Sequence, residues 1–280
     1  MRLATRIVTV FVGLALIAGC TSGGTPAGLE LPKPVPKQGS VVIDPLGRVR
    51  LTPADAKKGL HPLPARISID ALGTKDFLDA VFQNVSEFWA NQLGKLNRKP
   101  PKVTFNVAGH GDRVSSECLP PRLPKGTEDL LAFFCPLDNR IVISQRLAEQ
   151  VRKGKLSSPQ LGDRVTPNSG DLAVAYILAH EYGHAVQFSL GLFDRQSGPS
   201  ARIEQHADCW AGVWAHDAIT HHYLEDANLG EAVAAASLVG DYEANSPGHH
   251  GTPRERVSAL LLGYSGAKPS SCQPLLSRRR

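Results

Sequence analysis

Residues 171–190 read DLAVAYILAHEYGHAVQFSL, and the prediction of the fold starts from this stretch. Its apolar residues recur at helical spacing, which predicts one helix with Ser169 or Asp171 as N-cap and Gly191 at its end. The letters HEYGH, residues 180–184, lie in the middle of that helix. Helical geometry therefore fixes how their side chains are placed relative to one another.

His180 and His184 are four positions apart and share a face of the helix, so both imidazoles can bind one metal ion. Glu181 lies about 100° further round, where it can act as a general base without being a ligand. The chain has 10 His in 280 residues, so chance alone can produce this string. The surrounding sequence therefore has to support the assignment.

A zinc site of this kind needs a third protein ligand and an open fourth position. Residues 201–222 predict a second helix, on which Glu204 and Asp208 share a face. We expect Glu204 to bind the zinc and Asp208 to accept the free ring N–H of a ligating histidine. His206 lies about 200° round from Glu204 and is predicted to be a bystander. The alternative is a solvated acidic pair on a surface helix.

The chain resembles the bacterial putative neutral zinc metallopeptidases, whose members carry H-E-Y-G-H-x-V-Q followed by E-x-x-A-D-C-x-A-G. Five blocks in register support this resemblance: HEYGHAVQ (180–187), EQHADCWAG (204–212), CPLDNRIVI (135–143), HGTPRERV (250–257) and GYSGAKPSSC (263–272). They are spread over most of residues 75–272.

The resemblance implies an α+β, zincin-like metallopeptidase domain that is mainly helical with a small sheet. It implies one Zn²⁺ per chain, held by His180, His184 and Glu204, with Glu181 catalytic. In zincins the edge strand of the sheet pairs with extended substrate, and Arg140 to Ser144 is the candidate here.

The mechanism expected is hydrolysis of a peptide bond by zinc-activated water, with Glu181 as general base. A further donor stabilises the oxyanion in such reactions. His250 is one candidate for that donor. The others are His221, His222, His249 and Tyr242.

The first residues predict export. Arg2 and Arg6 flank the apolar run 7–18, which is too short to span a membrane and is typical of a signal peptide covering residues 1–19. Small residues before Cys20 resemble a bacterial lipobox. We expect Cys20 to become a lipidated N-terminus, with ordinary secretion as the alternative.

Residues 20–65 are rich in Gly, Pro and small polar residues, which predicts a semi-extended tether. Within it, Val41 to Leu51 predicts a short strand. Residues 66–280 form the expected metallopeptidase domain. In that domain the patterns predict a helix from Thr74 to Gly94, strands at 102–107 and 139–144, a helix through 149–152, and helices at 229–239 and 252–262.

Five cysteines are present. With Cys20 lipidated, an even set of four remains in an exported chain, for which three disulfide pairings are possible. The family resemblance favours Cys118 with Cys135 and Cys209 with Cys272.

The formal charge of +5 falls to +3 without the two arginines of the signal peptide, which is modest for a nucleic-acid binder. The expected partners are a peptide or protein substrate in the cell envelope and the membrane, reached through the lipid anchor, with no nucleic acid. The location expected is the extracytoplasmic side of the bacterial cell membrane.

Two other functions fit the same residues. One is a catalytically silent zinc lipoprotein that serves as a binding or chaperone-like module, although the intact Glu181 argues against it. The other is metal-dependent hydrolysis of a non-peptide amide, such as a cell-wall crosslink.

Overall fold

The computed structural model describes residues 67–276, apart from 122, 124–127, 159–161, 166–168, 194–199, 225–226 and 243–248, together with 42–43 and 49–50. The expected signal peptide and Cys20 lie outside the described residues, as does most of the tether. In the tether, the single strand expected over Val41 to Leu51 is wrong. Two short strands, β1 (Val42–Ile43) and β2 (Val49–Arg50), pair antiparallel there instead.

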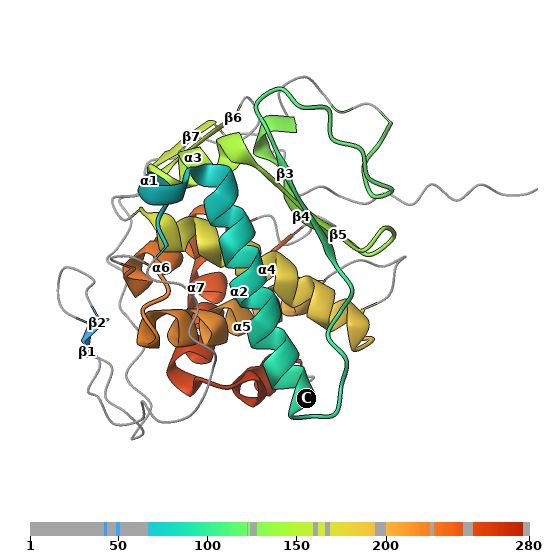
Figure 1. Ribbon diagram of the computed structural model, residues 1–280. Coiled ribbons are helices and arrows are strands. Elements are labelled where there is room, and N and C mark those ends of the chain that lie inside the picture. Colours follow the sequence, from blue (N-terminus) through green and yellow to red (C-terminus); the bar gives the residue numbers. More distant parts are fainter. Residues whose placement is uncertain are drawn as a thin grey trace, which may run out of the picture.

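Helices make up most of the described chain (Figure 1). They are α1 (Ile69–Leu72), α2 (Thr74–Gly94), α3 (Gln145–Arg152), α4 (Asp171–Ser189), α5 (Ala201–Thr220), α6 (Leu229–Leu238) and α7 (Pro253–Gly266), with the 3-10 helices η1 (Glu128–Leu130) and η2 (Pro269–Leu275). The remaining strands are β3 (Thr104–Ala108), β4 (Ala132–Cys135), β5 (Arg140–Ser144), β6 (Lys155–Ser158) and β7 (Gly162–Val165). The fold is the mainly helical α+β arrangement that the family resemblance implies.

Helix α4 is the centre of the domain, because every residue from Asp171 to Gln187 is buried. Its predicted N-cap is wrong: Gly170 is the N-cap, and neither Ser169 nor Asp171 caps the helix through its side chain. The carboxylate of Glu231 in α6 instead accepts the N–H of Leu172 at 2.9 Å. A Cβ at position 170 would lie 2.4 Å from that carboxylate, so glycine leaves the space that this long-range cap occupies.

Three strands form a mixed sheet along one side of the helices, in the order β3-β5-β4 (Figure 1). β3 runs parallel to β5 and β4 runs antiparallel to it. The expectation that Arg140 to Ser144 forms the edge is therefore wrong: this strand, β5, is central. The edge nearer the site is β4, a strand that the sequence did not predict. Phe105, Ile141 and Phe134 are register partners on the face that α2 and α4 cover.

Small residues set how closely the helices approach. A Cβ on Gly183 of α4 would lie 3.5 Å from Ala207 of α5, an ordinary contact that marks their crossing. Between α5 and α7 the backbones are closer, because a Cβ on Gly263 would lie 1.7 Å from the carbonyl oxygen of Cys209. A Cβ on Gly212 would lie 2.1 Å from the carbonyl oxygen of Leu260. Glycine is therefore required where α7 crosses α5.

Two disulfides join Cys118 to Cys135 and Cys209 to Cys272, which confirms the pairing implied by the family resemblance. The first closes the loop before β4, and the second ties η2 to α5. Helix α2 has the predicted bounds, Thr74 to Gly94, and Gly73 is its N-cap. Among the described residues, no helix combines the length and apolar character needed to cross a bilayer.

Candidate metal centre

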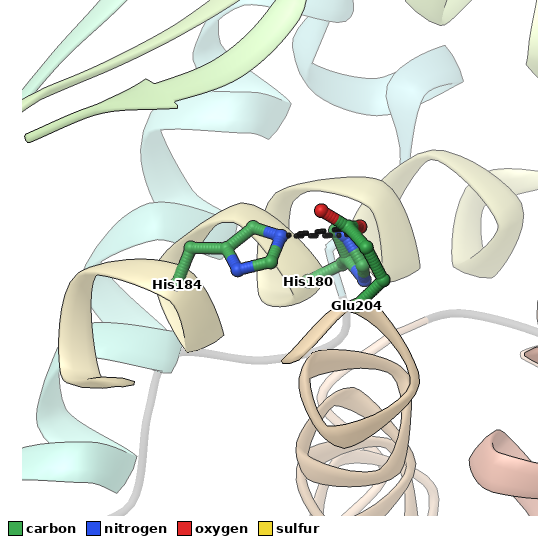
Figure 2. Close-up of side chains that lie close together, drawn as sticks. All are labelled: His180, His184 and Glu204. Atoms are coloured by element: carbon green, nitrogen blue, oxygen red, sulfur yellow. Dashed lines mark hydrogen bonds and ion pairs between the residues drawn. The ribbon is translucent and has the colours of Figure 1, made fainter. Parts of the chain in front are cut away.

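His180 and His184 of α4 meet Glu204 of α5 in a buried cluster (Figure 2). The Nε2 atoms of the two histidines are 3.1 Å apart. Oε2 of Glu204 lies 3.2 Å from Nε2 of His180 and 3.4 Å from Nε2 of His184. Donors at about 2.0–2.1 Å from a tetrahedral zinc would be separated by roughly 3.3 Å, so the spacing fits that ion. The α4–α5 crossing produces it, because Gly183 lies between the ligands and Ala207 is one turn after Glu204.

The outer nitrogens of the two histidines are held by different groups. Nδ1 of His180 lies 2.8 Å from Oδ1 of Asp208, and Nδ1 of His184 lies 2.8 Å from Oε1 of Gln187. Both oxygens can only accept, so each Nδ1 carries a proton, and Nε2 of each ring is the nitrogen left to bind a metal. Two ring nitrogens and a carboxylate oxygen therefore converge on one buried point, where a metal ion could displace the protons and bind all three.

Arg256 of α7 completes the partners of Asp208. Its Nε donates to Oδ2 at 2.9 Å and its Nη2 donates to Oδ1 at 2.8 Å, a two-point contact in the interior. The hydroxyl of Tyr176 donates to the same Oδ1 at 2.5 Å. Burial alone would raise the pKa of Asp208, but Arg256 and His180 outweigh it and lower the pKa to about 2. Asp208 is therefore ionised and can orient His180.

A neutral network holds His184. The side-chain amide of Gln187 donates to the carbonyl of Ile203 at 2.9 Å and to Nδ1 of His206 at 2.9 Å. Those two acceptors fix which end of the amide faces His184. Burial, then the nearby His184, lowers the pKa of His206 to about 4, which keeps its Nδ1 an acceptor. His206 is outside the ligand cluster, as expected, but it accepts a hydrogen bond from Gln187, which itself contacts His184.

The electrostatics also distinguish the candidate oxyanion donors. Burial raises the pKa of Glu204, but His184 and His250 are close enough to help hold that pKa well below its ordinary value. The backbone geometry agrees, because a Cβ on Gly251, the residue after His250, would lie 3.4 Å from the side-chain amide of Gln205, the residue after Glu204. Its backbone N–H donates to Asp241 at 3.1 Å, and the ring of His249 contacts the same carboxylate. Asp241 thus anchors both histidines of this loop.

The two histidines at the end of α5 lie elsewhere. His221 and His222 follow the last turn of α5, whereas Glu204 is in its first turn. At 1.5 Å per residue the two ends are about 25 Å apart, so neither histidine reaches the cluster. Tyr242 is 80 % exposed. Glu181 lies in α4 between His180 and His184, and it is 9 % exposed, against 5 % for each of these histidines.

Fold and cluster together define the class: a zincin-like domain in which a helix with the HExxH motif meets a glutamate from the next helix. Residues 64–275 match the model of the family described as "Putative neutral zinc metallopeptidase". The chain belongs to this family.

The chain is also similar to proteins whose names state no activity. The chain is 28% identical to Uncharacterized protein YpfJ of Escherichia coli over 221 residues, which are 70% of this chain and 69% of YpfJ. It is 31% identical to Uncharacterized protein Rv2575 of Mycobacterium tuberculosis over 166 residues, 50% of this chain and 53% of that protein. No solved structure matches.

Arg256 and Gln187 are the functional residues that sequence reasoning missed. Both stand inside blocks that carry the family resemblance, HGTPRERV and HEYGHAVQ. Gln187 is three positions after His184 and so lies on its face of α4, a signal that could have been used. Arg256 could not be placed, because its position depends on how α7 packs.

Proposed function

We propose that this chain is a zinc-dependent endopeptidase. One observation carries the proposal: three donor atoms from His180, His184 and Glu204 converge, while the N–H groups of both rings are directed to Asp208 and Gln187. Zinc bound there would polarise the scissile carbonyl and lower the pKa of water.

Glu181 is the general base in this proposal. It takes a proton from the attacking water and returns it to the leaving amine. Its place in α4, one residue after His180, directs it to the side of the ligands.

His250 is proposed to stabilise the oxyanion. Its influence on the pKa of Glu204 supports this role over His221 and His222, and the anchoring of its loop by Asp241 supports it further. A donor that is fixed in advance at the point where negative charge develops lowers the barrier most.

Peptide substrate is proposed to add to the sheet at β4. β4 is an edge of the three-stranded sheet in the described part of the chain, and it packs against α4. An extended peptide can pair with such an edge through its backbone and place its scissile bond beside the cluster.

The chain is further proposed to act outside the cytoplasm, tethered through a lipidated Cys20. The lipobox-like sequence before Cys20 supports the anchor, and two disulfides are typical of an oxidising compartment. Cys20→Ala should release the protein from membranes or block its processing. Processed, membrane-bound Cys20→Ala protein would contradict the anchor.

The deciding experiment compares wild type with Glu181→Gln for zinc content and for cleavage of a broad peptide library. Equal zinc in both, with chelator-sensitive cleavage only by wild type, supports the peptidase. Glu204→Ala should lose most of the zinc. Zinc binding by wild type without cleavage that depends on Glu181 would favour the binding-module function instead.

A further inference from the structure

Three aromatic side chains connect the metal centre to the edge of the sheet. Phe193 follows α4, and its ring meets the ring of His184 edge-on with centroids 6.2 Å apart. Phe188 of α4 lies next, with its ring centroid 5.7 Å from that of Phe193. The ring centroid of Phe134 in β4 is 6.0 Å from that of Phe188. We call Phe134, Phe188 and Phe193 the aromatic wall. All three are partly exposed.

Helix and strand geometry give the wall its position. Phe188 is four residues after His184, so it continues the face of α4 that carries the ligands. Phe134 is on the helix-covered face of β4, where it packs against the main core and so has a fixed position. The wall therefore extends from a proposed zinc ligand to the strand proposed to pair with substrate.

We infer that the aromatic wall binds a large apolar side chain of the peptide, next to the scissile bond. This inference rests on the proposed function. A peptide paired with β4 alternates its side chains between the two faces of the sheet, so those on the helix-covered face point toward Phe134. Aromatic rings favour aromatic or large aliphatic groups over small or charged ones. The substrate class is therefore a peptide with a bulky apolar residue at the cleavage site.

Hydroxamates test the wall without requiring catalysis, because a hydroxamate binds zinc directly. The probes are phenylalanine hydroxamate and glycine hydroxamate, titrated into the zinc-loaded chain. Wild type should bind the phenylalanine compound about 10- to 100-fold more tightly, the range that one apolar pocket contributes. Phe188→Ala should bring this ratio close to one and leave the affinity for glycine hydroxamate unchanged.

Tyr223→Ala is the matched control. Tyr223 is also a partly exposed aromatic residue, stacked on His221 beyond the end of α5 and away from the cluster. Its loss should leave the preference intact. Phe193→Ala is a second test should Phe188→Ala lose zinc or fold poorly.

The outcomes separate this inference from the proposed function. A wild-type ratio near one, or a ratio unaffected by both phenylalanine variants, overturns the aromatic wall as a subsite. A clear preference in a protein that cleaves no library peptide leaves the subsite standing and overturns the peptidase. Absence of zinc-dependent hydroxamate binding overturns both.

Discussion

Arg256→Met should be among the most damaging single substitutions in this domain. The carboxylate of Asp208 is fully buried, and Arg256 supplies two of its hydrogen bonds, at 2.8 and 2.9 Å. Removing one partner of a buried ion pair costs about 3–5 kcal/mol, because the other charge is left without compensation. For a domain of this size, that corresponds to about 2–4 °C in melting temperature for each kcal/mol.

A double variant separates stability from metal binding. Arg256→Met combined with Asp208→Leu removes both buried charges, so much of the lost stability should return. Zinc affinity should not return, because His180 has lost the acceptor that orients it, and such losses weaken binding by about 10- to 100-fold. Arg256→Lys, which keeps the charge without the two-point geometry, should lie between wild type and Arg256→Met.

The measurements are urea unfolding of the purified metal-free chain and zinc affinity by competition with a chromophoric chelator. A cost below about 1 kcal/mol for Arg256→Met would show that the pair is not the buried contact described here. A double variant no more stable than Arg256→Met would show that the loss comes from packing rather than from an uncompensated charge.

Three further predictions concern the metal, the helix crossing and the long-range cap. Removing the metal with a chelator should lower the melting temperature, and adding zinc should restore it. Free zinc at 100 to 1,000 times its dissociation constant should add about 3–4 kcal/mol to the free energy of unfolding. An unchanged melting temperature would argue against a zinc site. Gly263→Ala should lower the free energy of unfolding by about 3 kcal/mol or more, since the new Cβ would lie 1.7 Å from a backbone oxygen. Gly94→Ala is the control: a Cβ there would have no atom within 4 Å, so this variant should be neutral or stabilising. Burial raises the pKa of Glu231 from 4.5 to about 7, so the folded state binds the proton of this carboxyl more tightly than the unfolded state does. The wild type should therefore lose stability relative to Glu231→Gln as pH rises from 4.5 through 7. Parallel pH profiles of melting temperature for the two proteins would refute this.

Local patterns predicted the parts of the molecule that depend on local spacing. The i,i+4 relation placed His180 and His184 together, and the same relation put Glu204 and Asp208 on one face of α5. The family resemblance then supported the role of Glu204 and supplied the disulfide pairs. Helix α2 needed only its apolar periodicity.

The parts that failed depend on contacts between distant segments. The N-cap of α4 comes from Glu231, 59 residues beyond Leu172, so the sequence around Ser169 and Asp171 could not reveal it. β4 has four residues and begins two positions after the 3-10 helix η1, so it is too short for an alternating pattern to stand out. Missing β4 made β5 look like the edge of the sheet.

The unequal support of the two histidines explains why Arg256 belongs to the site. His180 is held by an ionised carboxylate and His184 by a neutral amide, so Asp208 alone would add a second negative charge to the buried cluster beside Glu204. Arg256 cancels that charge while leaving Asp208 able to accept the ring N–H. Zinc acts as a stronger Lewis acid where fewer uncompensated anions surround it. The close α5–α7 crossing at Gly212 and Gly263 brings Arg256 there, which links two glycines far from the ligands to the chemistry of the centre.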